Sequence, residues 1–344
     1  MTDERPSKPR IVCFGEVMLR LTAPRRALLL EVPNFDATIG GAEANVAVSL
    51  AHLGTEAAVV TMLPENALGR AALAEIARHR VDTSGVRLVP GRLGVYFATQ
   101  GAGIRAAEVL YDRKHSTFAN AAPDAVDWTK ALAGATRLHI SGVTPAIGAN
   151  AAAAAVRAAN EASRLGVGFS FDGNFRATLW SQWDGDAPSI LEAILANADI
   201  AFLEDRDIAL ILRRTFEGHD ENHRRLVAAR AAFERFAKLR TIACTTRRAL
   251  SGGGVELGAS LFSRNAESYS GPIALGDIVD RIGAGDAFAA GFLHGVGRGM
   301  TEAEALDFAL AAAAYKHSLP GDFNLVSEAE LLRFLREGQK DVRR

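Results

Sequence analysis

The hydrophobic positions of the chain alternate between short continuous apolar runs and longer segments with one apolar face. Residues 11–15 form a short run that ends in glycine, which is typical of a buried parallel strand. After Asp127 the two kinds of segment follow one another in turn. The pattern predicts strands at residues 137–141, 167–171, 200–203 and 241–245, and helices at residues 149–164, 189–196 and 226–236. This alternation predicts an α/β fold with a mainly parallel sheet covered by helices on both faces.

The first third of the chain has a different pattern. It predicts a helix that begins at the glycine pair 40–41 and ends before Gly54, a strand at residues 57–62 and a helix at residues 71–79. Residues 17–39 and 86–113 carry short apolar pieces without helical spacing, broken by proline or glycine. We expect these two segments to form a small sheet outside the main one.

Polar side chains gather at or just after the ends of the predicted strands. In parallel sheets the carboxyl ends of the strands share one edge, where ligands bind. The residues expected there are Glu16, Asn45, Ser141, Asp172, Asn174 and Arg176. Arg176 can bind a carboxylate or a phosphate through two hydrogen bonds, although a capped loop with a surface arginine would have the same sequence.

Residues 280–288 read as an acidic loop, a glycine turn and the first turn of a helix. Ala284, Phe288, Phe292 and Val296 are spaced by four residues and predict one buried face on that helix. Free N–H groups at its start favour an anion, and Asp286 could accept a proton from a hydroxyl there. The segment alone is equally compatible with a helix that Asp286 merely caps.

Composition narrows the class of protein. The chain has 344 residues, 49% of them hydrophobic and 23% charged, which is typical of a globular protein. Its net charge of −1 does not favour nucleic acid or an anionic membrane surface as a partner. No signal peptide or membrane span is expected, and Cys13 and Cys244 lie in apolar runs, so we expect a cytoplasmic protein. Walker-type and dinucleotide-binding glycine motifs are absent, and the histidines show no metal-ligand spacing.

Two motifs resemble the signatures of the ribokinase-like (PfkB-type) carbohydrate kinases. The C-terminal one is Asp-Arg-Ile-Gly-Ala-Gly-Asp-Ala-Phe-Ala-Ala-Gly at residues 280–291, and the N-terminal one is Gly-Gly-Ala-Glu-Ala-Asn-Val-Ala at residues 40–47. Further stretches resemble the 2-dehydro-3-deoxygluconate kinases of that family, among them residues 111–114, 141–145, 172–176 and 316–324. The resemblance implies a three-layer α/β/α domain over residues 10–340, with a small β-sheet lid from approximately residues 17–39 and 86–113.

The resemblance implies that ATP and Mg²⁺ are needed and that a phosphoryl group goes to the 6-hydroxyl of 2-dehydro-3-deoxy-D-gluconate. It makes Asp286 the base and gives the anion hole to Gly283, Ala284 and Gly285. It implies substrate contacts from Glu16, Gly40, Gly41, Ala42, Asn45, Tyr96, Tyr111, Arg113, Arg176 and Asp286. Of the two arginines it favours Arg176 on the acidic substrate, shared with nucleotide phosphates. The tyrosines could instead belong to the core of the lid or to a homodimer contact, and a homodimer or larger homo-oligomer is expected.

The nucleotide and metal regions depart from the family pattern. An Asn-x-x-Glu motif is expected after the strand at 200–203, but Glu204-Asp205-Arg206-Asp207 stands there, which leaves Asp207 or Glu204 as the metal candidates. The glycines of the nucleotide loop are displaced. The candidate nucleotide contacts are Asn174, Arg176, Thr246, Arg247, Gly253, Gly283 and Gly285. Arg281 stands where many members carry threonine.

Two alternative functions stay open at this point. The chain could phosphorylate a neutral sugar such as fructose or ribose, since kinases of this fold share many motifs. It could also be a sugar- or nucleotide-binding regulator that has lost catalysis, as the altered nucleotide region would allow. The intact Gly-Ala-Gly-Asp at 283–286 favours an enzyme.

Overall fold

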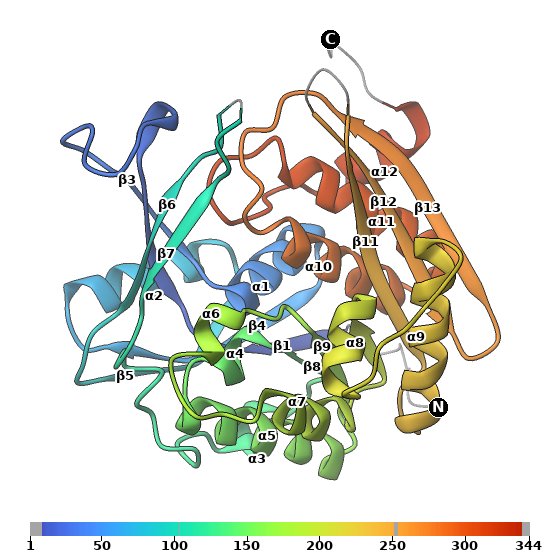
Figure 1. The fold of residues 1–344 in the computed structure, drawn as a ribbon. Helices are drawn as coiled ribbons and strands as arrows, with labels where there is room; N and C mark the ends of the chain where they lie inside the picture. Colours follow the sequence, from blue (N-terminus) through green and yellow to red (C-terminus); the bar gives the residue numbers. More distant parts are fainter. Residues whose placement is uncertain (1–8, 103, 251–253, 339–344) are drawn as a thin grey trace, which may run out of the picture.

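The structure is a computed structural model that describes residues 9–102, 104–250 and 254–338. Its centre is a nine-stranded sheet in the order β13-β12-β11-β10-β9-β8-β1-β4-β5, with helices on both faces (Figure 1). The strands of this sheet are β1 (Arg10–Phe14), β4 (Glu56–Pro64), β5 (Asp82–Val89), β8 (Arg137–Ser141), β9 (Gly168–Asp172), β10 (Ile200–Phe202), β11 (Thr241–Ala249), β12 (Val255–Ser263) and β13 (Glu267–Leu275). The α/β architecture with a mainly parallel sheet that the sequence predicts is confirmed.

The order of the strands reverses beside β1. From β1 the chain runs outward to β4 and β5, and it then returns on the other side of β1 to form β8, β9, β10 and β11. All pairings from β11 across to β5 are parallel, whereas β12 and β13 are antiparallel. A reversal of this kind opens a crevice at the carboxyl ends of the strands, which is where open α/β sheets bind ligands.

Buried parallel strands send alternate side chains to opposite faces, which explains the continuous apolar runs. In β1, Ile11 and Cys13 join one core cluster, whereas Val12 and Phe14 join the other. The first cluster includes residues of α1 (Ala42–Leu53), α2 (Ala67–Arg78), α10 (Ala284–Gly297) and α11 (Glu302–Lys316). The second includes residues of α5 (Ala149–Arg164), α7 (Ala187–Leu195), α8 (Asp205–Ile211) and α9 (Glu221–Arg235). The remaining helices are α3 (Trp128–Ala131), α4 (Val143–Ala146), α6 (Ala177–Trp180) and α12 (Glu328–Glu337).

A second sheet stands beside the body of the molecule (Figure 1). Its order is β3-β2-β6-β7, with β2 at Met18–Thr22, β3 at Asp36–Gly40, β6 at Gly94–Thr99 and β7 at Glu108–Asp112. We call these four strands the lid sheet. Residues 86–113 were expected to belong to this small sheet, but Val86–Val89 pair with β4 and extend the main sheet instead. The free backbone groups along the edge of β4 explain this pairing.

Three other expectations need correction. The strand expected to end at Thr245 continues to Ala249, because Thr246–Ala249 pair with residues 255–258 of β12 in a hairpin. The helix at 226–236 begins earlier, at Glu221. One buried face was expected on α10, but the helix is buried on nearly all sides between Asp286 and Gly295, since Gly291 lets α11 approach closely. Val296, which was expected on the buried face, is 37% exposed. Among the described residues, no helix is long and apolar enough to cross a bilayer.

Candidate active site

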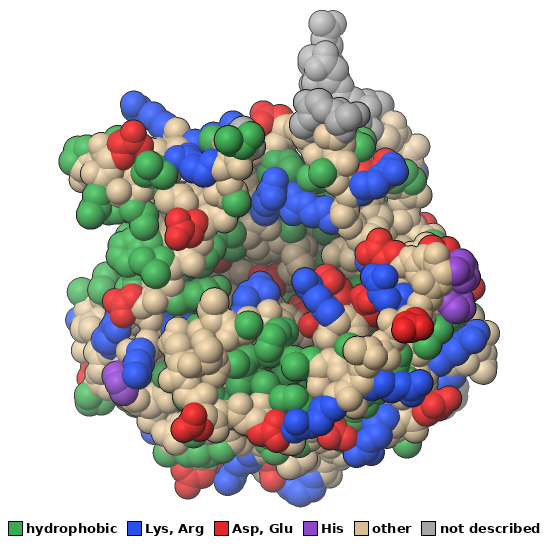
Figure 2. All heavy atoms as spheres, viewed as in Figure 1, with side chains coloured by type: hydrophobic (Ala, Val, Ile, Leu, Met, Phe, Trp, Pro, Cys, Tyr) green, Lys and Arg blue, Asp and Glu red, His purple; other side chains and the backbone are tan. Residues whose placement is uncertain are grey.

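A cavity of about 680 Å³ lies between the lid sheet and the carboxyl ends of the main strands. Figure 2 shows this hollow, with basic and acidic side chains around its edge. The lid sheet contributes Met18, Tyr96 and Tyr111 to its wall, and the start of α1 contributes Gly41, Ala42 and Asn45. The opposite wall comes from residues that end or follow β9 and β10, from the middle of β11, and from the start of α10.

Asp286 lies in the first turn of α10 and is 8% exposed. Asn45 Nδ2 donates a hydrogen bond of 2.7 Å to its Oδ2. Burial raises the pKa of Asp286 to about 7, the Asn45 hydrogen bond lowers that pKa, and the charges of Asp322 and Glu43 raise it. A carboxyl group that titrates near neutral pH is suited to accept a proton in one state and release it in another.

Glycine is required in the turn that precedes Asp286. Gly283 caps α10 in the left-handed region at φ 84°, and a Cβ there would lie 2.0 Å from the carbonyl oxygen of Asp322. Ala284 is one of the three expected anion-hole residues, but its N–H already donates a hydrogen bond to the Arg281 carbonyl at 3.2 Å. Gly285 is exposed at the cavity wall, and a Cβ there would meet no atom within 4 Å.

The glycine pair before α1 serves two different contacts. Gly41 lines the cavity at φ 143°, and a Cβ there would lie 2.2 Å from the Glu16 carbonyl oxygen. Gly40 does not line the cavity, because its Cα faces the Asp322 carboxylate, which would lie 2.1 Å from a Cβ. The structure therefore brings Gly41, Ala42 and Asn45 together at the cavity wall, but not Gly40.

Arg113 is a buried cation at the cavity wall. Its Nε and Nη2 lie 2.7 Å and 2.6 Å from Oε2 of Glu16, and both side chains are at most 3% exposed. Its guanidinium lies 5.4 Å from the centre of the Tyr111 ring. Nη1 is buried and has no hydrogen-bond partner among the described residues. Glu16 itself does not line the cavity; its Oε2 pairs with Arg113, and its Oε1 is buried without a hydrogen-bond partner among the described residues.

Several carboxylates gather at the other end of the cavity. Asp172, Glu204 and Asp207 all line it. Burial raises the pKa of Asp172 well above its usual range, and the charges of Asp286 and Asp207 add to this. Burial also raises the pKa of Asp207 to about 6, and one of its oxygens accepts the N–H of Glu204 at 2.9 Å. Asn174 and Arg176 line the same region.

The expected nucleotide contacts on β11 are only partly brought to this wall. Thr245 and Arg247 line the cavity, whereas Thr246 does not. The period of two along a strand turns Thr246 to the other side, where its hydroxyl faces Gly258 of β12. Gly253 lies outside the described residues. Ser141 is also off the wall, because its hydroxyl donates to buried Glu43 at 2.8 Å.

Comparison with known proteins places this geometry in a family. The sequence model of the pfkB family carbohydrate kinases matches residues 8–327. The chain belongs to the pfkB family of carbohydrate kinases. This confirms the resemblance seen in the two glycine motifs.

Similar proteins of the family cover the chain almost completely. It is 31% identical to the 2-dehydro-3-deoxygalactonokinase of Haloferax volcanii over 336 residues, which cover 97% of this chain and 99% of that protein. The crystal structure of 2-dehydro-3-deoxygluconokinase from Thermotoga maritima superposes with a TM-score of 0.89 at 34% identity and covers 95% of this chain and 99% of that one. A pfkB family carbohydrate kinase from Listeria grayi has a TM-score of 0.88 at 32% identity and covers 95% and 100%.

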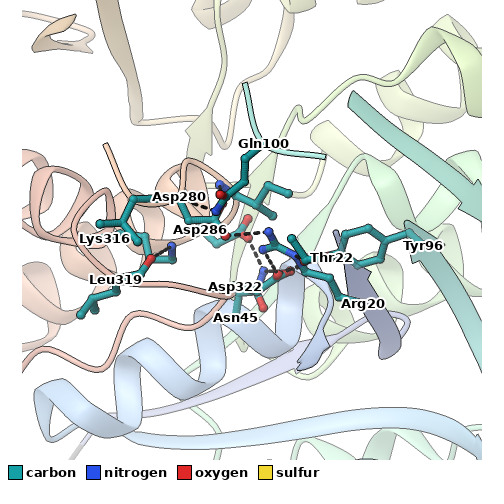
Figure 3. Close-up of polar contacts among 12 residues, drawn as sticks. Arg20, Thr22, Asn45, Tyr96, Gln100, Asp280, Asp286, Lys316, Leu319 and Asp322 are labelled. Carbon is teal, nitrogen blue, oxygen red and sulfur yellow. Dashed lines mark hydrogen bonds and ion pairs between the residues drawn. The ribbon is translucent and has the colours of Figure 1, made fainter. Parts of the chain in front are cut away.

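This carbohydrate kinase also has a buried network that sequence reasoning missed. Figure 3 shows the Asp322 carboxylate between Arg20, Tyr96 and Asn45. Arg20 Nη1 donates to Asp322 at 2.9 Å, its Nη2 lies 2.6 Å from Asp280, and the Tyr96 hydroxyl donates to Asp322 at 2.6–2.7 Å. Because Arg20 and Tyr96 belong to the lid sheet, the network ties that sheet to the loop before α10. The signal for Arg20 was its position between Met18 and Thr22 on the buried face of an alternating strand.

Replacing Arg20 with methionine is expected to lower the free energy of unfolding by about 3–5 kcal/mol, because Asp280 and Asp322 would stay buried without their cation. Urea unfolding followed by circular dichroism measures the change. Arg92→Met is the matched control, since Arg92 precedes β6 and its pair with Asp112 of β7 is 41% and 58% exposed and should contribute at most about 1 kcal/mol. An equal effect of both substitutions would contradict the role of Arg20.

Proposed function

We propose that this kinase transfers the γ-phosphoryl group of ATP to the 6-hydroxyl of 2-dehydro-3-deoxy-D-gluconate or of its galactonate epimer. The observation that carries the proposal is Arg113, a buried guanidinium at the cavity wall whose Nη1 amino group has no partner among the described residues. A buried donor without an acceptor is costly unless a ligand supplies one, and a sugar carboxylate would supply a charged one. The names of the Haloferax and Thermotoga relatives cover both epimers, so both belong in the test.

The proposed role of Asp286 is that of the base. Its carboxylate would accept the hydroxyl proton of the sugar as the oxygen bonds to the γ-phosphorus, while Asn45 holds the carboxylate in place. The backbone at Gly283 and Gly285 would hold the transferring group at the start of α10, where the helix dipole favours negative charge. Gly41, Ala42 and Asn45 would contact sugar hydroxyls, and Tyr111 would cover the sugar beside Arg113. Catalysis of phosphoryl transfer consists mostly of such positioning.

This assignment gives the carboxylate of the substrate to Arg113, whereas the resemblance favoured Arg176. Arg176 is exposed, its Nη1 donates to the Phe175 carbonyl at 3.2 Å, and it lowers the pKa values of Asp172, Asp207 and Asp286. It therefore lies at the acidic end of the cavity, where the phosphates of ATP would arrive together with Asn174. Arg113 is the better partner for the carboxylate because Glu16 fixes its orientation.

The acidic end also fits magnesium. Among the described residues, no group of three or more ligating side chains could hold a metal by itself. Mg²⁺ in kinases is commonly bound by one or two carboxylates together with substrate phosphates and water. Glu204, Asp207 and Asp172 crowd their charges at the wall, and a divalent cation would relieve that repulsion. We assign Asp207 and Glu204 to this role, and the metal would neutralise phosphate charge there.

Three wider proposals accompany this function. Residues 10–340 would act as one kinase domain, with the lid sheet covering the sugar and excluding water. Two copies would pair through the lid sheet, since its apolar side chains Leu110 and Val109 of β7 and Leu30 near β3 are 54%, 38% and 84% exposed. A monomer mass in light scattering would exclude this dimer.

The reaction would take place in the cytoplasm, which is rich in ATP. Cell fractionation would test this location.

Product analysis tests the proposed function. The enzyme is incubated with ATP, Mg²⁺ and one of four sugars, namely the two 2-dehydro-3-deoxy acids, fructose and ribose, and the products are followed by ³¹P NMR. We expect one ADP and one phosphate ester at the 6-position for each acid molecule consumed. Ester formation from the neutral sugars alone would favour the neutral-sugar kinase. Sugar-dependent thermal stabilisation without any ester would favour a regulator that has lost catalysis.

A further inference from the structure

Among the described residues, three arginines that line the cavity form no ion pair: Arg176, which lies at the acidic end, and Arg247 and Arg281, which do not. Arg247 lies near the end of β11, and Arg281 lies two residues before Gly283; both line the cavity. The part of the chain that the structure describes provides no ion pair for either guanidinium, whereas Arg113 pairs with Glu16 and Arg206 lies 2.9 Å from Glu204. The acidic group nearest in sequence, Asp280, is already bound to Arg20.

Both guanidinium groups belong to the wall of the same cavity, and both carry a positive charge. Burial lowers the pKa of Arg247, and the charge of Arg281 lowers it further. Both arginines also contribute to the lowered pKa of His317, which lines the same part of the cavity and whose pKa burial lowers first. Two like charges held at one wall cost free energy unless an anion lies between them. Figure 2 shows basic side chains gathered along the upper edge of the hollow.

Arg247 and Arg281 lie far from Arg113, where the carboxylate of the sugar is proposed to bind. The Glu16–Arg113 pair follows β1, and β11 lies four strands away in the order β1-β8-β9-β10-β11. At about 4.8 Å per strand, this is roughly 19 Å, far too long for one sugar but suitable for a sugar and a nucleotide in line. Arg281 belongs to the loop that leads into the start of α10, so it lies beside the point of transfer.

We propose that Arg247 and Arg281 together bind the diphosphate of the nucleotide, the part that stays behind when the γ-phosphoryl group leaves. This rests on the proposed function, which supplies the nucleotide. In the transfer, the bond between the γ-phosphorus and the β–γ bridging oxygen breaks as the sugar oxygen bonds to phosphorus. The sugar proton goes to Asp286, and the electron pair of the broken bond stays on the diphosphate of ADP. Two guanidinium groups are suited to neutralise that added charge.

Binding of ADP and of adenosine to single and double variants tests the pair. Arg247→Gln and Arg281→Gln are each expected to weaken ADP binding about tenfold in calorimetry, and the double variant about a hundredfold. Adenosine affinity should stay within about twofold of wild type, since adenosine carries no phosphate. Arg248→Gln is the matched control, because Arg248 is the next residue of β11, is bound to Glu256 at 2.8 Å and does not line the cavity.

The outcomes separate the pair from the proposed function. ADP affinity unchanged in the double variant, or an equal loss for adenosine and ADP, would overturn the proposal even if wild type phosphorylates the sugar acids. If wild type phosphorylates no sugar acid but ADP affinity still depends on both arginines, the diphosphate site stands and the proposed substrate is wrong. Thermal melting of each variant verifies its fold, and Arg247→Lys/Arg281→Lys should recover part of the lost affinity because it keeps both charges.

Discussion

Replacing Asp286 with asparagine is expected to lower kcat by roughly 10²–10⁴-fold, because the amide cannot accept the sugar proton. Asparagine has the same shape, and its side-chain oxygen can still accept the hydrogen bond from Asn45 Nδ2, which is 2.7 Å long in wild type. Binding of the sugar acid should change little. A coupled assay for ADP release measures the loss, and calorimetry with the sugar acid measures binding. Near-normal kcat would contradict the role of Asp286.

The same substitution should stabilise the fold at high pH. Burial raises the pKa of Asp286 from 3.8 to about 7. Burying its ionised form therefore destabilises the fold, fully above pH 7 and not at all below about pH 4. The neutral asparagine removes this cost, on the order of 2–4 kcal/mol at pH 8. The melting temperature of Asp286→Asn should therefore exceed that of wild type at pH 8 and approach it near pH 4. An equal difference at both pH values would contradict the raised pKa.

Wild-type kcat/KM should report the same group, since this ratio reflects ionisation in the free enzyme. Below pH 7 most Asp286 is protonated and cannot act as a base, so kcat/KM should fall about tenfold per pH unit on the acid side and level off above. Circular dichroism at each pH verifies that the fold persists. A flat profile between pH 5.5 and 8 would show that this ionisation does not control the reaction.

Loss of Arg113 is expected to be the second-largest effect. Arg113→Gln alone would leave Glu16 buried without its partner, at a cost of about 3–5 kcal/mol in stability. The informative variant is therefore Glu16→Gln/Arg113→Gln. It should lower kcat/KM for a 2-dehydro-3-deoxy acid by roughly 100-fold through the lost charge-assisted hydrogen bond, and leave kcat/KM for fructose unchanged.

Arg176→Gln is the matched comparison for this prediction. Arg176 lies at the acidic end of the cavity, so its loss should raise the KM for ATP and affect acidic and neutral sugars alike. If Arg176→Gln instead removes the preference for the acid and the double variant keeps it, the assignment from the structure is wrong. The role that the resemblance gave to Arg176 would then be correct.

The sequence predicted those parts of the fold and site that local pattern encodes. Strand 137–141 and helix 149–164 have the predicted bounds, because an apolar run and a long amphipathic segment are bounded there by glycines or polar residues. Asn45 and Asp286 were both singled out, although their direct contact joins residues 241 positions apart. Both follow glycine turns, which mark the start of a helix in the sequence.

Long-range pairing accounts for what was missed. Glu16 was expected to contact a ligand because it follows a strand, but one oxygen of its carboxylate pairs with Arg113, 97 residues later, and Glu16 does not line the cavity. Thr246 was misplaced because the expected loop is a strand, and the period of two decides which residues face the cavity. Arg20, Asp280 and Asp322 come from three distant segments, and no local pattern shows that they meet.

The ratio of kcat/KM for 2-dehydro-3-deoxygluconate to that for fructose tests the central claim most directly. Both values are measured with wild-type enzyme, ATP and Mg²⁺ at pH 8, where Asp286 is ionised. With a buried guanidinium to bind the carboxylate, the ratio should exceed about 100, and the galactonate epimer should give a ratio of similar size. A ratio at or below one would contradict the proposal that this pfkB family kinase acts on a sugar acid.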